Sequence, residues 1–179
     1  MLTATDSVLL VIDVQEKLFR VMYQKEQLAD NLQRLIKGMQ VLEVPVLVTE
    51  QYPQGLGPTI PEIAQLLAEV KPYPKVNFSC CGDEAFLRAF RQLRRKQVLI
   101  AGIESHVCVY QTAADLIAAG YEVYVVSDAV SSRTEKNKDT GIQMMLQSGA
   151  KLTGTEAALF ELLKVAKGET SKAISQIVK

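Results

Sequence analysis

Three polar residues in the sequence have the side-chain types that covalent hydrolysis of a carbonyl compound needs. Asp13 and Cys108 each follow a short apolar run, and Lys75 lies in an extended stretch stiffened by prolines. A thiolate attacks electrophilic carbon, a carboxylate can take the thiol proton, and an ammonium group favours negative charge on its neighbours. Brought together, the three residues would form a Cys–Asp–Lys site for attack on a carbonyl or similar carbon.

Each of these residues also has a purely structural interpretation. Asp13 could cap the next helix, Lys75 could be an exposed lysine, and Cys108 could be a small core residue, since free cysteine is often buried. Asp128 closes a later apolar run and is more typical of a turn. His106 is the only histidine, so no multi-histidine metal site can form, and its position is typical of the first turn of a helix.

The position of Cys108 favours a reactive thiol. A helix is predicted over residues 106–119, and a helix N-terminus lowers the pKa of a cysteine through its free N–H groups and its dipole. The same N–H groups can stabilise an oxyanion. Cys80 and Cys81 also precede a predicted helix but have no matched acid or amine. We therefore expect Cys108 to be the most reactive of the three thiols.

Strand-like runs that alternate with amphipathic segments would position these residues. Buried strands are predicted at 7–13, 44–50, 97–103 and 121–130, with shorter ones within 71–79 and 150–154. Helices are predicted at 25–42, 83–93, 106–119, 135–149 and 155–166, and residues 51–62 are predicted to be a loop. Continuous apolar strands between helices indicate a parallel sheet covered on both faces. We expect one three-layer α/β/α domain over residues 1–179, with a doubly wound, mainly parallel sheet.

Composition narrows the classes of partner. The 179 residues carry 20 basic and 20 acidic side chains, and this zero net charge argues against a nucleic-acid binder. The basic run 88–96 is interpreted as the solvated face of a helix. No apolar run approaches the ~20 residues of a membrane helix, and the N-terminus lacks the basic start of a signal peptide. Three cysteines, an odd number, are typical of a reduced, cytoplasmic protein.

Three segments carry a resemblance to a known family. They are "LLVIDVQ", "PKVNFS" and "AGIESHVCVYQTAADLIAAGYEVYVVSDAVSSR", and their order and spacing resemble the isochorismatase-like cysteine hydrolase superfamily over about residues 7–155. Within it the chain looks most similar to small isochorismatase-domain proteins of uncertain substrate. The resemblance implies a Rossmann-like fold, with Asp13 as the catalytic aspartate, Lys75 as the catalytic lysine and Cys108 as the nucleophile.

The resemblance also implies details of the pocket. A cis peptide is expected between Ile103 and Glu104, which would turn a backbone N–H toward the oxyanion, so that Glu104 and Cys108 donate through their main chains. Further pocket-wall candidates come from the loops after the first two strands: Gln15, Phe19, Thr49, Gln51 and Tyr52.

Two departures from the family pattern bear on the reaction. Nicotinamidases of this superfamily carry an Asp and His metal cluster after the second strand, whereas "TEQYPQGLGPTIPE" has no histidine. We therefore expect no catalytic metal and no cofactor. Isochorismatases often lack the cysteine, which this chain keeps, so attack on a small amide or related carbonyl compound is favoured. The alternatives are an isochorismatase that cleaves a vinyl ether, and a catalytically weak binding or scaffold protein of the same fold.

Two further expectations concern assembly and stability. Apolar stripes in the last two helical segments, namely Leu159, Leu162 and Leu163, then Ile174, Ile177 and Val178, predict a homo-oligomer, although they could instead pack within the chain. Because Asp13, Lys75 and Cys108 follow strands around a crevice, we expect their substitution to reduce turnover far more than it alters folding.

Overall fold

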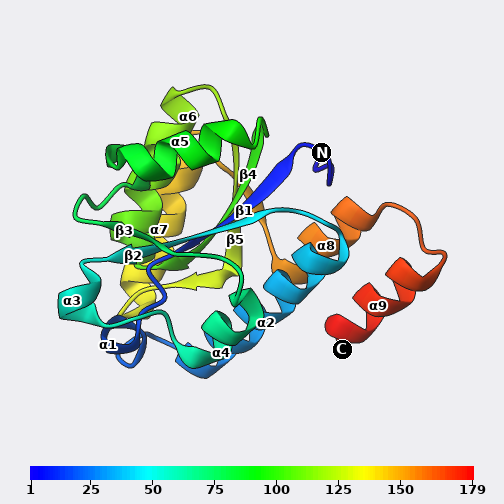
Figure 1. Cartoon of the computed structure of the whole chain (residues 1–179), viewed down its shortest axis with the longest axis horizontal. Helices are drawn as coiled ribbons and strands as arrows, with labels where there is room; N and C mark the ends of the chain where they lie inside the picture. The colour runs from blue at the N-terminus through cyan, green and yellow to red at the C-terminus, as the bar shows by residue number, and fades with distance from the viewer.

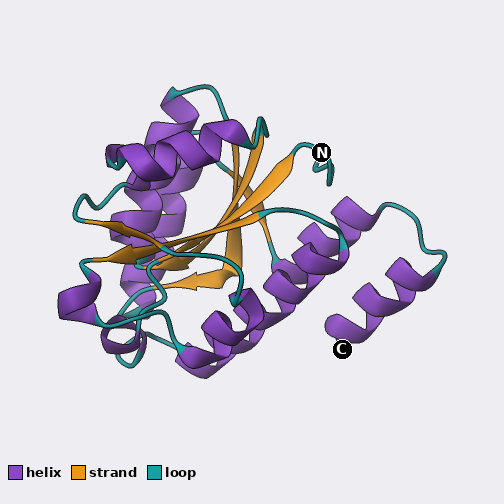
Figure 2. Cartoon of the chain, in the orientation of Figure 1, coloured by secondary structure: helices purple, strands orange, loops and turns teal.

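Six parallel strands form one sheet in the order β3-β2-β1-β4-β5-β6. The computed structural model describes residues 1–179. The strands are β1 Ser7–Ile12, β2 Val46–Gln51, β3 Tyr73–Lys75, β4 Gln97–Ile103, β5 Glu122–Ser131 and β6 Lys151–Thr153. The chain winds in one direction from β1 to β3 and in the other from β4 to β6, so the strand order reverses between β1 and β4. This topology confirms the predicted doubly wound α/β fold (Figures 1 and 2).

Helices cover both faces of the sheet (Figure 1). One face carries α2 Lys25–Val41, α4 Pro61–Ala64, α8 Thr155–Leu163 and α9 Glu169–Ile177, and the other carries α5 Glu84–Gln92, α6 Tyr110–Ala118 and α7 Glu135–Gln147. The remaining elements are short: α1 Glu16–Phe19, α3 Pro53–Leu56, a 3-10 turn at Gln65–Leu67, another at Cys80–Gly82, and a π-helical turn at Ser105–Val109. No helix combines the length and apolar character needed to cross a membrane.

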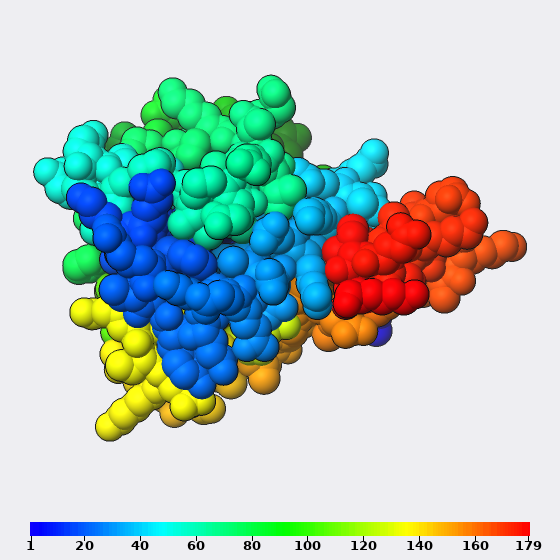
Figure 3. Space-filling view, turned by 90° about the horizontal axis from the view of Figure 1, so that it is seen from below, coloured from blue at the N-terminus to red at the C-terminus, as the bar shows by residue number.

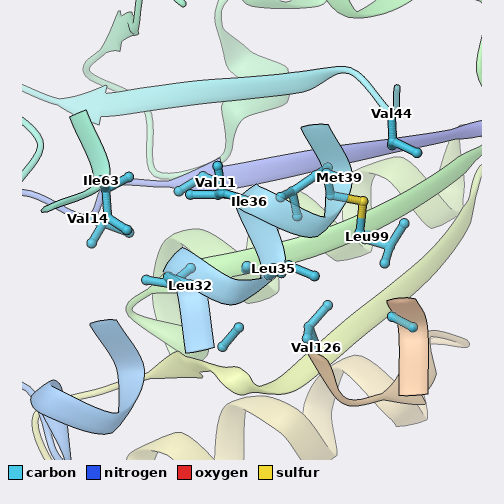
Figure 4. Close-up of a cluster of buried hydrophobic side chains, with 14 of the residues drawn as sticks. Val11, Val14, Leu32, Leu35, Ile36, Met39, Val44, Ile63, Leu99 and Val126 are labelled. Carbon is cyan, nitrogen blue, oxygen red and sulfur yellow. The ribbon is translucent and has the colours of Figure 1, made fainter. Parts of the chain in front are cut away.

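The fully apolar strands feed two cores. In β1, Leu9 and Val11 belong to the cluster beneath α2, whereas Val8, Leu10 and Ile12 belong to the cluster beneath α5 and α6. Alternate side chains of a strand point to opposite faces, so a strand buried on both faces is apolar at most positions, and in β1 only Ser7 is polar. The predicted stripe on α2 packs into the first cluster, as Figure 4 shows for Leu32, Leu35, Ile36 and Met39.

Local structure differs from the sequence-based expectation in two places. The predicted loop 51–62 contains α3 and the start of α4, each with a proline at its first position, where the fixed φ of proline suits a helix. The helix expected over 106–119 begins as a π-helical turn, and regular α6 starts only at Tyr110.

The C-terminal helices pack against α2 within the chain. Leu159 and Ile174 are fully buried, and Leu163, Ile177 and Val178 are partly buried against the same cluster. Figure 3 shows the C-terminal segment lying beside the α2 region. The stripes therefore follow the alternative of packing within the chain and give no argument for an oligomer, because α2 supplies apolar surface that covers them.

Candidate active site

The structure brings Asp13, Lys75 and Cys108 together at the carboxyl edge of the sheet. Asp13 directly follows β1, Lys75 ends β3, and Cys108 lies in the π-helical turn after β4. The Lys75 Nζ lies 2.7 Å from Asp13 Oδ2. Asp13 is 0% exposed, Lys75 3% and Cys108 6%. The edge lies where the strand order reverses, which is the usual ligand position in such sheets.

Lys75 is held by four oxygen acceptors. Besides Asp13, its Nζ donates to Gln51 Oε1 at 2.7 Å and to the carbonyl oxygens of Phe78 and Asn77 at 2.9 and 3.2 Å. Burial acts to lower the pKa of Lys75, but the negative charge of Asp13 and the hydrogen bond to its carboxylate act against it, and the pKa is raised. The ammonium group is therefore retained at neutral pH, and its contacts with the segment after β3 fix its position.

Asp13 is held on both of its oxygens. Oδ2 accepts the hydrogen bond from Lys75 Nζ, and Oδ1 accepts a hydrogen bond of 2.8 Å from Thr49 Oγ1. The Cys80 Sγ lies 3.7 Å from that hydroxyl, so a second thiol reaches the same cluster. Thr49 is fully buried and supports the carboxylate from β2. The sequence analysis placed Thr49 in the pocket wall and identified no partner for Cys80. The one available sign that Cys80 lies near the site was its closeness to Lys75 in the sequence.

Cys108 rests as a neutral thiol. Burial raises its pKa above the ordinary range, and the charge of Asp13 and a hydrogen bond to its carboxylate add to that effect, with Lys75 opposing it. The expected lowering of this pKa by a helix N-terminus was wrong, because the thiol is almost completely removed from water beside a carboxylate. A base must therefore take its proton before it can attack, and Asp13 is placed to do so.

The π-helical turn is fixed by close packing against α7. A Cβ on Gly141 would overlap the backbone of Ser105 and His106, so only glycine allows this approach. Ser132 Oγ accepts the Ser105 N–H at 3.1 Å and lies 2.7 Å from Ser105 Oγ. His106 Nδ1 lies 3.0 Å from the same Ser132 Oγ. The single histidine therefore helps to hold the turn that carries Cys108.

Glu104 precedes this turn. The Ile103–Glu104 peptide bond has the cis form that the resemblance implied. The backbone N–H of Glu104 donates to no acceptor within the protein, which leaves it available to a ligand. The Glu104 carboxylate is engaged elsewhere, since its Oε2 accepts from the Arg133 backbone N–H at 3.0 Å and from Arg133 Nε at 3.1 Å.

The isochorismatase domain model matches residues 7–157, most of the chain and the whole region of this site. The chain belongs to the isochorismatase family. A similar relative is the secreted isochorismatase effector Isc1 of Phytophthora sojae, 40% identical over 177 residues, which cover 97% of this chain and 84% of that protein.

Two solved structures of similar proteins show the same fold. The MAR1 ribonuclease of Caenorhabditis elegans is 36% identical with a TM-score of 0.92, over 99% of this chain and 91% of that one. The Escherichia coli YcaC protein, described as an octameric hydrolase of unknown specificity, is 24% identical with a TM-score of 0.93, over 98% and 88%. Membership of the family supports a hydrolase activity in general.

The pocket-wall candidates have different positions in this isochorismatase-family chain. Gln15 is fully buried and uses its amide to fasten loops, donating to the carbonyl oxygens of Gln51 and Gly57 at 2.9 and 2.7 Å and accepting the Gln51 N–H at 2.7 Å. Gln51 itself contacts Lys75. Phe19 packs against the core, and Tyr52 is exposed.

Two further polar groups bear on the sequence-based hypotheses. Asp128 lies away from the site, where its Oδ1 accepts the Thr155 N–H and Oγ1, each at 2.9 Å, at the start of α8. The turn expected from sequence was wrong, because Asp128 lies within β5 and its carboxylate caps the start of α8. No three His, Cys, Asp or Glu side chains gather as a metal-binding group anywhere in the chain. The expectation of no catalytic metal stays a prediction, tested below by chelation.

The raised pKa values of the three thiols predict how the free energy of unfolding depends on pH. Burial raises the pKa of Cys80 to about 12 and that of Cys81 to about 11, and it raises that of Cys108 as well. The folded protein thus holds these protons more tightly than the unfolded chain, whose thiols ionise near pH ~9. The stabilisation is complete below that pH and is lost as the pH rises through the folded values. For Cys80 alone the loss between pH ~9 and ~11 is about 2–3 kcal/mol.

Urea unfolding across this alkaline range measures the effect. The free energy of unfolding is expected to fall steeply in the natural protein and less steeply in Cys80→Ala. Equal slopes in the two proteins would contradict the assignment of the effect to the buried thiol.

Proposed function

We propose that this protein is a metal-independent cysteine hydrolase that acts on a small amide or a related carbonyl compound. The observation that carries the proposal is the buried ion pair of 2.7 Å between Lys75 and Asp13 beside the Cys108 thiol. A thiol, a carboxylate and a fixed ammonium group in one water-poor site supply a nucleophile, a proton acceptor and charge stabilisation.

In the first half-reaction, Asp13 takes the Cys108 proton as the sulfur attacks the carbonyl carbon of the substrate. The Lys75 ammonium stabilises the negative charge that passes between the carboxylate and the thiolate. The carbonyl oxygen gains negative charge and accepts the backbone N–H groups of Glu104 and Cys108. The carbon–nitrogen bond then breaks, Asp13 returns the proton to the leaving amine, and a thioester on Cys108 remains.

In the second half-reaction, water replaces the amine. Asp13, again a carboxylate, takes a proton from water as its oxygen attacks the thioester carbon. The carbon–sulfur bond breaks, the acid product leaves, and the proton on Asp13 returns to the thiolate. Gln51 takes part as a positioning residue, because it receives one hydrogen bond from Lys75 and so helps to aim the ammonium group.

A substrate screen tests this function. Small amides, ureides and carbamoyl compounds are incubated with the protein, with Cys108→Ala as the matched control and with a chelator in a parallel arm. Isochorismate and an RNA oligonucleotide are included, the latter because the similar protein from Caenorhabditis elegans is named a ribonuclease. Turnover of an amide-type compound that Cys108→Ala loses and the chelator leaves unchanged is expected. Isochorismate cleavage that survives Cys108→Ala would favour the vinyl ether reaction, and no turnover at all would favour a scaffold.

Alkylation of the thiols provides a test that needs no substrate. We expect iodoacetamide to label Cys108 fastest at neutral pH, because Asp13 takes the proton during attack. Asp13→Asn removes that base and should slow the labelling of Cys108 by roughly tenfold or more, whereas Cys81, which is distant from the ion pair, should react at an unchanged rate.

Peptide mapping by mass spectrometry gives both rates in one sample, so Cys81 serves as an internal control. Preferential labelling of Cys80 or Cys81, with Cys108 untouched by iodoacetamide and by a smaller reagent, would count against the nucleophile. A thermal melt of Asp13→Asn establishes that the variant is folded during labelling.

We also propose that the protein forms a homo-oligomer. The support is a group of exposed apolar side chains beside the site, Tyr52, Val76 and Phe78, which are 56, 76 and 54% exposed. The octameric YcaC neighbour of the same fold points in the same direction. Light scattering at micromolar concentration is expected to give a multiple of 19.8 kDa.

Phe78→Ser should reduce the measured mass, and Phe160→Ser, which changes an exposed apolar residue on α8, should not. A mass of one chain for the natural protein would refute the assembly. The three free cysteines further support a reducing compartment, and we propose the cytoplasm.

A further inference from the structure

A pocket lies on the opposite side of β2 from the candidate active site. Its volume is about 270 Å³, and its lining includes Val48 and Glu50 of β2 and Leu67, Ala64 and Ala68 of the segment that follows α3. Val48 and Leu67 are buried and form its floor, while the two alanines are exposed at its rim. The volume falls slightly below the ~300–1,000 Å³ typical of drug-sized ligands, so the pocket suits a smaller molecule.

Glu50 supplies the only charge in this lining. Its Oε1 accepts the Thr59 N–H at 2.7 Å and the Thr59 Oγ1 at 2.8 Å, which fixes the carboxylate against the pocket wall. Both hydrogen bonds that Glu50 accepts go to Oε1, so Oε2, which is not closed off from solvent, stays without a protein donor, and no lysine or arginine forms an ion pair with it. A half-buried carboxylate with one anchored and one free oxygen, above an apolar floor, complements a cation that carries a small apolar body.

We propose that this pocket binds a small organic ammonium ion. The nitrogen donates to Glu50 Oε2, and the hydrocarbon part packs on Val48 and Leu67. A structural role for Glu50 explains the two bonds to Thr59, which hold the loop before α4. It does not explain the apolar hollow beside the free oxygen or the lack of a protein cation there.

The pocket is joined to the candidate active site through one strand. Glu50 lies between Thr49, which donates to Asp13, and Gln51, which accepts from Lys75. Thr59 forms a bridge with Gln15, whose amide holds the Gln51 backbone. An occupant of the pocket would therefore contact the strand residue that separates the two supports of the ion pair.

Binding of cyclohexylammonium, with cyclohexanol as the neutral analogue of equal shape, tests the proposal by chemical-shift titration of the full chain. The chemical shifts of the pocket residues are expected to change until they saturate with cyclohexylammonium. Cyclohexylammonium should bind roughly tenfold more tightly than cyclohexanol, because it gains one charge-assisted hydrogen bond. Glu50→Gln keeps an oxygen for Thr59 and removes the charge, so it should abolish that tenfold preference. Ala68→Leu fills the rim and should weaken both probes.

Glu62→Gln is the matched control, because Glu62 is an exposed glutamate of α4 outside the lining, and it should leave binding unchanged. Thermal melts establish that all variants are folded. The proposal would be overturned if neither probe showed saturable binding at concentrations up to about 10 mM. This limit lies above a dissociation constant of ~1 mM, which corresponds to a binding free energy of about −4 kcal/mol. Equal affinity of Glu50→Gln and the natural protein for cyclohexylammonium would overturn it as well.

Discussion

Replacing Lys75 with methionine is expected to lower the free energy of unfolding by about 3–5 kcal/mol, the cost of removing one partner of a buried ion pair. Methionine has a similar length and no charge, so it leaves the Asp13 carboxylate buried without its cation. It also leaves Gln51 Oε1 and the Phe78 carbonyl oxygen without the donor that they share. Urea unfolding at neutral pH measures the loss.

Two variants show whether the effect arises from the buried charge. Lys151→Met removes a lysine whose ion pair with Glu122 has the same length of 2.7 Å but is about half exposed on both sides. An exposed pair contributes only about 0–1 kcal/mol, so this control should be nearly neutral. The double change of Asp13→Asn with Lys75→Met removes both charges and should recover much of the stability. If Lys75→Met cost no more than Lys151→Met, the buried pair would not hold the fold as described.

This result would also correct an expectation drawn from sequence. Residues at strand ends around a crevice were expected to affect turnover far more than folding. Asp13 and Lys75 are instead 0 and 3% exposed, and each makes several hydrogen bonds inside the protein. Their substitution is therefore expected to change both properties, and kinetic effects must be compared among variants shown to be folded.

The sequence predicts well whatever follows from local pattern. The strand β4 was predicted with its observed limits, Gln97–Ile103, because a short apolar run such as the one that follows Gln97 is typical of a strand buried on both faces of a sheet. The helix predicted from residue 83 begins there with Asp83 as its cap, whose side chain accepts the Phe86 N–H. The convergence of Asp13, Lys75 and Cys108 followed from one rule, that parallel strands end at a common edge.

What the sequence could not predict depends on contacts between distant segments. The closeness of Cys80 to Lys75 in the sequence does not identify Thr49, which comes from a different strand, as the neighbour of its sulfur. The burial that raises the pKa of Cys108 likewise arises from neighbours on several elements. The covering of the α9 stripe by α2 could not be foreseen for the same reason, since the stripe alone does not identify its partner.

Replacing Cys108 with alanine is expected to lower kcat/KM by roughly a thousandfold or more for any amide-type substrate, because covalent attack is lost entirely. Alanine at this nearly buried position removes the sulfur and leaves Asp13 and Lys75 paired, so the loss of stability should be smaller than that of Lys75→Met. Thermal melts of the same samples separate the two effects.

The losses at Cys108 and Asp13 are expected not to add. Asp13→Asn keeps the size of the side chain but removes the group that takes the thiol proton, so it acts on the same step as Cys108→Ala. Once the sulfur is gone there is no thiol proton for Asp13 to take, and the double variant should be about as inactive as Cys108→Ala alone. Losses that multiply would mean that the two residues act in separate steps. Near-normal turnover by Cys108→Ala would end the covalent mechanism and leave the vinyl ether reaction, which needs no thiol, as the better account of this site.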